Sequence, residues 1–231
     1  MKDVNDICFI VQARLSSERV PRKMIKPFAG TSVVEIMCKK INKSKSIPRD
    51  NFFFSAFEDE IKEVVNRNNL QLFNRSRESA FSEGPMQEVM EYHDKLDYKY
   101  SVVISACCPL LSIETIDSFV QDYINSPYDG MFSVISKRNY YWNEDHDMIT
   151  KWPKDADVLN TKLVGVTYEA AHCLYAGRLD TIKDGIWMAP PPFKKNSPAL
   201  FVVPEEEVFD IDYQWQFEVA EALYKNKILN E

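Results

Sequence analysis

The feature that most constrains the fold is the alternation of strand-like and helix-like segments along residues 7–135. Short apolar runs rich in β-branched residues are typical of buried strands, and capped or amphipathic segments follow them. The pattern predicts strands at 7–13, 51–57, 71–74, 98–106 and 129–135, and helices at 32–42, 59–68, 85–96 and 113–124. Such alternation implies right-handed βαβ crossovers and an α/β fold with a mostly parallel sheet covered on both faces. Its ligand site is expected at the carboxyl ends of the strands.

The second half of the chain interrupts this alternation. Residues 137–152 are aromatic and polar without a helical period, and Pro190–Phe193 and Pro198 mark an irregular loop. We therefore expect a small β-rich arm inserted at approximately 137–198 within a single domain of residues 1–231.

Charge and composition exclude several classes of protein. The chain has 28 Lys+Arg against 35 Asp+Glu, a net charge of −7, and 45% hydrophobic residues, which is typical of a folded globular domain. The acidic balance argues against nucleic acid as a partner. No apolar run approaches the ~20 residues of a membrane span, so no membrane partner is expected. Five scattered cysteines predict free thiols and a reducing, cytoplasmic location.

A basic loop follows the first predicted strand. Within residues 14–26 a single acid, Glu18, is outnumbered by five cations: Arg14, Arg19, Arg22, Lys23 and Lys26. Guanidinium forks bind phosphate oxygens in pairs, and lysine adds a mobile point charge. A solvated basic loop is the alternative, but the position after the first strand favours a polyphosphate site. The spacing matches neither a P-loop nor a dinucleotide-binding glycine motif.

Two carboxylates, Asp210 and Asp212, stand near the end of the chain. They close a predicted strand at 208–211 and precede a predicted helix at 213–225. Residues i and i+2 of a strand share one face, so both carboxylates can point into one site and suit Mg²⁺. The alternative is that Asp212 caps the helix while Asp210 is solvated.

Four segments resemble the nucleotide-sugar cytidylyltransferases, a group that includes CMP-N-acetylneuraminate synthetases, 3-deoxy-manno-octulosonate cytidylyltransferases and the spore-coat polysaccharide type. The opening IVQARLSSERVPRKMIKPFAG is similar to the family pattern R-x-x-S-x-R-x-P-x-K, filled by Arg14, Ser17, Arg19, Pro21 and Lys23. FNRSRESA, ISACCPLL and FDIDYQWQFEVAEAL follow in the family's order. The resemblance spans Ile7 to Leu223.

The resemblance implies a three-layer, Rossmann-like fold of the GT-A type that binds CTP and Mg²⁺. A sugar hydroxyl would attack the α-phosphate and expel pyrophosphate. The implied catalytic residues are Arg14, Lys23, Asp210 and Asp212, the two aspartates being the metal ligands. The implied nucleotide-binding residues are Arg14, Ser17, Arg19, Lys23, Arg75 and Cys107.

Two positions depart from the family pattern. Cys107 stands where many relatives carry a metal-binding aspartate, and a thiol is a poor Mg²⁺ ligand. We interpret it as a small buried residue under the nucleotide, and the number of metal ions, one or two, stays open. TYEAAHCLYAG resembles the acceptor segment Y-E-x-N-G-x-x-Y, but Ala171 and His172 replace its Asn-Gly pair. Tyr168, His172 and Tyr175 are therefore the expected acceptor-binding residues, for a nonulosonic acid other than sialic acid or another modified sugar.

The aromatic group in the inserted region has two readings. Tyr140, Tyr141, Trp142 and Trp152 can contact a partner chain or form a satellite core, and relatives dimerise through an insertion here, so a homodimer is expected. Three other functions stay open. They are a nucleotidyltransferase using another nucleotide or a sugar 1-phosphate, a GT-A glycosyltransferase, and a catalytically inactive nucleotide-binding homologue.

Overall fold

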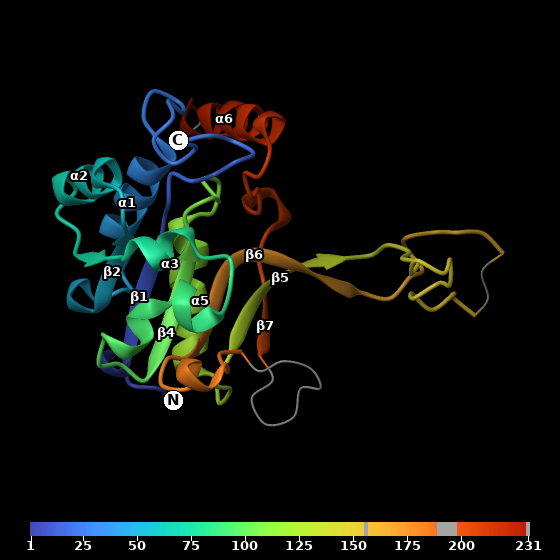
Figure 1. Cartoon of the computed structure of the whole chain (residues 1–231). Helices are drawn as coiled ribbons and strands as arrows, with labels where there is room; N and C mark the ends of the chain where they lie inside the picture. The colour runs from blue at the N-terminus through green and yellow to red at the C-terminus, as the bar shows by residue number, and fades with distance from the viewer. Residues whose placement is uncertain (155–156, 189–197, 230–231) are drawn as a thin grey trace.

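A seven-stranded sheet in the order β3-β2-β1-β4-β6-β5-β7 organises the protein (Figure 1). The computed structural model describes residues 1–154, 157–188 and 198–229. The strands are β1 (Ile7–Gln12), β2 (Phe52–Ala56), β3 (Leu72–Asn74), β4 (Tyr100–Ser105), β5 (Met131–Lys137), β6 (Thr167–Arg178) and β7 (Ala199–Val202). The α-helices are α1 (Val33–Lys43), α2 (Asp59–Arg67), α3 (Arg77–Phe81), α4 (Met86–Val89), α5 (Ile113–Asn125) and α6 (Gln214–Leu229).

The strand directions confirm the predicted α/β class. β1 pairs in parallel with β2 and β4, β2 with β3, and β5 with β7, while β6 runs antiparallel to both of its neighbours. The chain moves outward from β1 to β3 and then returns to place β4 on the other side of β1. This reversal creates a switch point between β1 and β4, where α/β proteins bind ligands.

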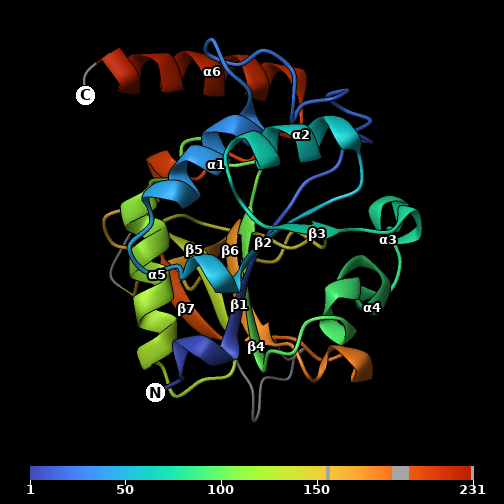
Figure 2. The same cartoon turned by 90° about the vertical axis from the view of Figure 1, so that its left-hand side faces the viewer.

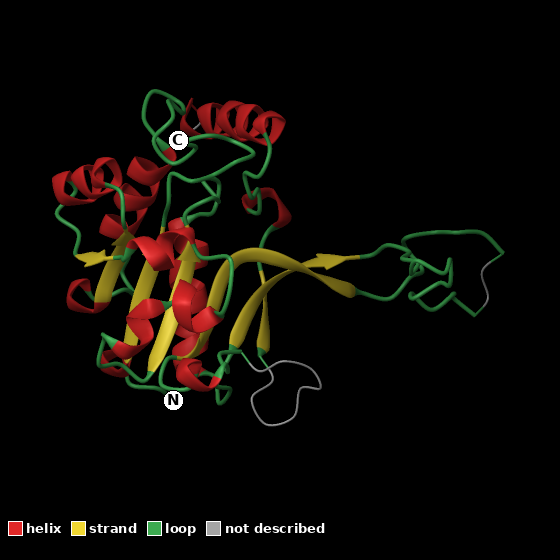
Figure 3. Ribbon diagram, viewed as in Figure 1, coloured by secondary structure: helices red, strands yellow, loops and turns green. Residues whose placement is uncertain are grey.

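Helices cover both faces of the sheet and make the predicted three layers (Figure 3). Alternate β1 residues divide between the two faces, because successive side chains of a strand point in opposite directions. Phe9 and Val11 join the main core with α1, α2 and α5, while Cys8 and Ile10 join a second cluster that includes Tyr92. α6 lies across the top of the sheet, beside the loop that follows β1 (Figure 2).

Local signals explain where several helices begin and how α6 is held. The Ser32 hydroxyl accepts a hydrogen bond from the Glu35 amide at 3.3 Å, and Ser112 caps α5 in the same way. The predicted closing helix buries Phe217 and Ala220. The Phe217 ring contacts Phe28 edge to face at 5.2 Å between centroids, so the helix is packed against the loop after β1.

Two predicted elements are wrong. The helix expected at 85–96 is divided into α4 and a 3-10 turn at Glu91–Asp94, because the backbone leaves the helical conformation at Met90. The strand expected at 208–211 is irregular, and its Ile211 amide donates to the Cys107 carbonyl beyond the end of β4. Helix α3 and strand β7 were not predicted.

β5 and β6 extend past the sheet into an arm that projects from the body at residues 138–154 and 157–166 (Figure 1). β6 itself belongs to the central sheet, and the loop predicted at Pro190–Phe193 lies outside the described residues. The aromatic group of the arm is divided: Tyr140 is buried and lies 6.1 Å from Trp152 between ring centroids, whereas Trp142 is 48% exposed. Within the described ranges, no helix is both long enough and apolar enough to cross a membrane.

A wide bulge marks the point where β6 leaves the sheet for the arm. Phe132 of β5 pairs with Tyr175, whereas Val134, two residues later, pairs with Ala170. The buried Ser133 hydroxyl accepts a hydrogen bond from the Leu174 amide at 3.0 Å and so replaces part of the interrupted ladder. Bulges bend a strand and re-aim its side chains, and this one carries His172.

Candidate active site

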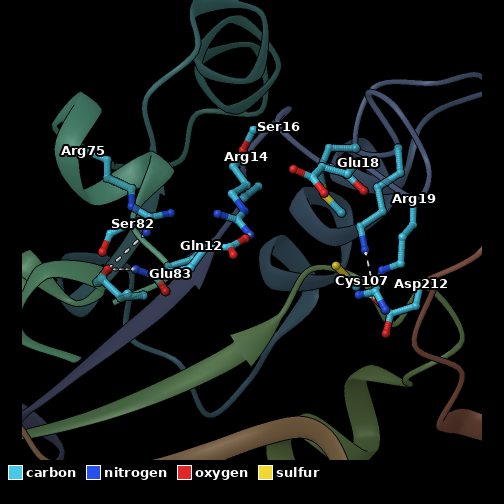
Figure 4. Close-up of a pocket in the computed structure, with 15 residues that line it drawn as sticks. Gln12, Arg14, Ser16, Glu18, Arg19, Arg75, Ser82, Glu83, Cys107 and Asp212 are labelled. Atoms are coloured by element: carbon cyan, nitrogen blue, oxygen red, sulfur yellow. Dashed lines mark hydrogen bonds and ion pairs between the residues drawn. The ribbon is translucent and has the colours of Figure 1, made fainter. Parts of the chain in front are cut away.

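A cavity of about 710 Å³ opens at the carboxyl ends of β1 and β4, at the switch point of the sheet (Figure 4). The end of β1 and the loop after it supply most of its lining, and the rest comes from the ends of β3 and β4, the turn after α3, the end of α4 and the segment before α6. Of the residues predicted from the sequence, it is lined by Arg14, Ser17, Arg19, Lys23, Arg75, Cys107 and Asp212.

One end of the cavity holds the basic loop against the carboxylates. Arg19 Nη2 lies 2.6 Å from Asp212 Oδ1, and Lys23 Nζ lies 3.9 Å from the same oxygen. The Lys23 ammonium also donates to the Ile211 carbonyl, and its side chain is only 12% exposed. Two cations and a carboxylate from distant parts of the chain therefore meet at the mouth of the cavity.

The opposite end of the cavity carries two guanidinium groups. Arg14 donates to the Ala80 carbonyl at 3.4 Å and pairs with Glu83 at 3.3 Å. Arg75 is 6% exposed and donates to the Ser79 hydroxyl at 2.9 Å, yet it forms no ion pair within the described part of the chain. Burial and then the charge of Arg14 lower the pKa of Arg75. A buried guanidinium without a carboxylate partner suits an anionic or carbonyl-bearing ligand.

The carboxylate pair fits a hard divalent cation. Burial raises the pKa of Asp210, and the neighbouring Asp212 raises it further, because the two carboxylates repel each other in the free protein. Mg²⁺ relieves such repulsion and usually takes one or two carboxylates, leaving its other positions to water and phosphate. Across residues 1–154, 157–188 and 198–229, no cluster of three or more His, Cys, Asp or Glu could hold a metal.

Cys107 is half-buried and lines the cavity near Lys23. Burial raises the pKa of its thiol despite an opposing effect of Lys23, so the group is neutral at neutral pH. All five cysteines are free, as predicted. The Cys107 carbonyl accepts the Ile211 amide at 3.2 Å, so this residue also anchors the backbone of the carboxylate segment.

The three predicted acceptor residues lie on β6, outside the lining of the cavity. Tyr175 Oη lies 3.3 Å from His172 Nδ1, and the Phe132 ring contacts both of their rings. Both side chains interact electrostatically with the Asp210 carboxylate, since His172 acts on the pKa of Asp210 and Asp210 acts on the pKa of Tyr175. Tyr168, in contrast, is 54% exposed and pairs with Ser136 toward the arm.

His172 has a strained backbone, with φ at +51°. Residues other than glycine rarely adopt this left-handed conformation, and it costs about 1–2 kcal/mol. Strain of this kind gathers at functional sites, where surrounding structure holds it in place. The bulge and the strain together make His172 a candidate functional residue.

Several lining residues were missed from the sequence, among them Gln12, Ser82 and Glu83. Gln12 had a usable signal, since it is a polar residue that ends an otherwise apolar strand. Its side-chain amide donates to the Val89 carbonyl at 3.1 Å, which Arg75 also contacts. Ser82 and Glu83 had no such signal, because they reach the cavity only through the turn after α3.

A cationic cavity at the switch point of an α/β sheet, with Asp212 in its lining and Asp210 two residues away outside it, is the arrangement of a nucleotidyltransferase. The Cytidylyltransferase family profile matches residues 8–230, so the chain belongs to this family. It is therefore an enzyme of the nucleotidyltransferase class, homologous to CMP-sugar synthetases, and the resemblance read from the sequence is confirmed.

Similar proteins agree with this assignment. The pseudaminic acid cytidylyltransferase of Campylobacter jejuni is 25% identical over 96% of this chain and 97% of its own length. The spore coat polysaccharide biosynthesis protein SpsF of Bacillus subtilis is 30% identical over 27% of each chain.

Solved structures share the fold. A CMP:2-keto-3-deoxy-manno-octonic acid synthetase complexed with CTP has a TM-score of 0.68 at 12% identity, covering 96% of this chain and 99% of its own. The 4-diphosphocytidyl-2C-methyl-D-erythritol synthase of Anaerococcus prevotii has a TM-score of 0.64 at 13% identity, covering 99% and 100%.

Proposed function

We propose that this enzyme uses CTP and Mg²⁺ to join CMP to the hydroxyl of an acidic sugar, a nonulosonic acid or a related modified sugar, releasing pyrophosphate. The observation that carries the proposal is the charge of the cavity, which four cationic side chains line together with Asp212, the carboxylate that holds two of them. The names of the relatives from Campylobacter jejuni and Bacillus subtilis support a role in nucleotide-sugar and polysaccharide biosynthesis.

The basic loop is the proposed binding site of the triphosphate. Arg14, Arg19 and Lys23 would neutralise phosphate oxygens, and the Ser17 hydroxyl would donate to them. Phosphoryl transfer needs positioning and charge stabilisation more than covalent chemistry, so these side chains can supply most of the required catalysis. Arg75 would meet the base or the phosphates from the opposite wall.

Asp210 and Asp212 are the proposed Mg²⁺ ligands, a role for which their oxygen donors and mutual repulsion are suited. When bound, the ion would neutralise charge on the phosphate oxygens. Occupation of Asp212 would free Arg19 and Lys23, which it now holds, for the triphosphate.

His172 and Tyr175 are the proposed contacts of the acceptor, because they combine hydrogen-bonding groups with proximity to Asp210. Tyr168 lies farther along β6, toward the arm, so its part would be at the outer edge of the acceptor site. The exposed apolar residues of the arm support a homodimer, and the cytoplasmic location predicted from the sequence is part of the proposal.

The decisive experiment is a thermal-stability panel with CTP, UTP, ATP, GTP and dTTP, each with and without Mg²⁺. A ligand at 100 times its Kd stabilises a protein by about 2.7 kcal/mol, which is roughly 5–10 °C in a chain of this size. We expect this shift for CTP with Mg²⁺ and its loss in Asp210→Asn. A shift with another nucleotide would overturn the base specificity, and CTP binding without pyrophosphate release in the presence of acidic sugars would overturn the acceptor class. No shift with any nucleotide would overturn the assignment of this cavity as the triphosphate site.

A further inference from the structure

Glu58 contacts the backbone of the basic loop and acts electrostatically on Arg75, although it lies outside the loop itself. It follows β2 and begins α2, where its backbone carbonyl accepts hydrogen bonds from the Ile61 and Lys62 amides. Its carboxylate makes no capping hydrogen bond to its own helix. Instead, Glu58 Oε1 accepts a hydrogen bond from the Leu15 amide at 2.8 Å, 43 positions away in the chain.

This contact fixes the backbone at the start of the basic loop. Leu15 stands between Arg14 and Ser16, both of which line the cavity. A hydrogen bond from a backbone amide to a carboxylate is stronger than a neutral one, so it restrains the direction in which these two side chains leave the backbone. The Ala13 amide is held one step earlier by the Ser55 carbonyl at 3.2 Å, so β2 and the turn after it form the base of the loop.

The same corner contains unused hydrogen-bonding capacity. Glu58 Oε2 and the Ser16 hydroxyl are both buried and have no partner in the described part of the structure. Glu58 also acts electrostatically on Arg75, whose guanidinium has no ion-pair partner there. A half-buried carboxylate beside an anion site repels phosphate, so its presence requires a compensating role.

We propose that Glu58 is a positioning residue for the nucleotide site, which orients the loop of Arg14 and Ser16 through its hydrogen bond to the Leu15 amide. This inference rests on the proposed function, because it takes the loop to be the triphosphate site. The hydrogen bond and the negative charge of Glu58 have opposite effects on phosphate, since the first organises the loop and the second repels the ligand.

Two variants of similar size separate these effects. Glu58→Gln keeps an acceptor oxygen and removes the charge, whereas Glu58→Met removes both. For Glu58→Met we expect the CTP Kd and KM to rise about 10- to 100-fold with kcat changed less, as for loss of a hydrogen bond to a charged group. Glu58→Gln should bind CTP as tightly as the wild type or more tightly. The control is Asp59→Asn, an exposed neighbour that pairs with Lys62, and it should bind CTP normally.

The measurement is calorimetric CTP binding with Mg²⁺, together with KM, kcat and the melting temperature of each free variant. Unchanged CTP binding in a folded Glu58→Met would overturn the proposal, and so would equal weakening in Glu58→Gln. Tighter CTP binding in both variants would also overturn it, because only the repulsion between the Glu58 charge and phosphate would then affect binding. If Glu58→Met does not fold, hydrogen exchange at the Leu15 amide decides, because a fast-exchanging amide contradicts the contact. If the wild type does not bind CTP, the proposed function fails, and inorganic tripolyphosphate then serves as the probe of the loop.

Discussion

Arg19 and Asp212 stand 193 positions apart in the chain, and their side chains form an ion pair of 2.6 Å at the mouth of the cavity. The pair joins the two groups on which the proposed chemistry depends, a phosphate-binding cation and a metal-binding carboxylate. In the free protein each side chain is the ion-pair partner of the other. Binding of Mg²⁺ to Asp212 would release Arg19 for CTP, and binding of CTP to Arg19 would release Asp212 for Mg²⁺, so the two ligands should bind cooperatively.

Removal of Arg19 should therefore separate the affinities for metal and for nucleotide. In Arg19→Gln, Asp212 loses its partner, and we expect Mg²⁺ alone to bind about two- to fivefold more tightly, as for release from an exposed ion pair. CTP should bind about tenfold more weakly, because a guanidinium contact to phosphate is lost. Calorimetric titration with each ligand separately is the measurement. Weaker binding of Mg²⁺ alone would contradict this account.

Asp210→Asn and Arg14→Ala should each reduce turnover severely without unfolding the protein. Loss of one preorganised charge at a phosphoryl-transfer site costs about 10²–10³ in kcat. Both residues lie at the periphery of the core, so circular dichroism should match that of the wild type and neither variant should melt markedly below it. Pyrophosphate release is the assay, and retained activity in both variants would refute the site assignment.

The raised pKa of Asp210 predicts a particular dependence of stability on pH. The folded state binds this proton more tightly than the unfolded chain, in which the pKa is about 3.8. Stability from this group is therefore greatest below pH 3.8 and falls as pH rises through the folded pKa. Without Mg²⁺, Asp210→Asn should melt above the wild type at pH 7, and the difference should shrink at pH 4. A difference in melting temperature that grows on acidification would contradict the raised pKa of Asp210.

His172→Gly tests whether the strained bulge serves the acceptor. Relief of about 1 kcal/mol of left-handed strain should offset most of the lost ring contacts, so the melting temperature should stay within about 3 °C of the wild type. We expect KM for the sugar to rise at least tenfold while the CTP Kd is unchanged. His146→Gly is the matched control, since His146 also has a positive φ, +69°, but lies on the arm. Equal kinetics in the two variants would remove His172 from the acceptor site.

Ser32→Ala provides a change in stability that should leave the chemistry untouched. Its hydroxyl caps α1 at the Glu35 amide, and loss of such a cap costs about 1 kcal/mol. For a chain of this length the melting temperature should fall by about 2–4 °C. Differential scanning calorimetry checks the fall, and an altered kcat would mean that α1 influences the cavity.

The sheet and most of its helices were predictable because they depend on local patterns. An apolar run such as Ile7–Val11 can only be buried on both faces, and Ser32 with Glu35 marks a helix start without reference to the rest of the chain. The prediction of a single helix at 85–96 was wrong because the conformation of this segment depends on tertiary packing. Burial of Tyr92 in the second core decides the path of that segment, and no local pattern expresses it.

The candidate site shows the same division. Its cations and carboxylates could be named from the sequence, because residue types that bind phosphate and Mg²⁺ stand together in the basic loop and at Asp210 and Asp212. Their geometry could not. Asp212 meets Arg19 because Ile211 is tied to Cys107 and not because it ends a strand.

The sequence by itself determined the fold class and the family, since both are carried by residue type and by spacing along the chain, and it indicated the residue types of the candidate site. Only the tertiary structure decided which groups face one another. Glu58 contacts Leu15, Arg75 is buried without an ion-pair partner among the described residues, and His172 is held in a strained bulge. Crossovers of the sheet bring distant parts of the chain together at these positions. Packing therefore creates the contacts and the strain, and local sequence patterns cannot predict them.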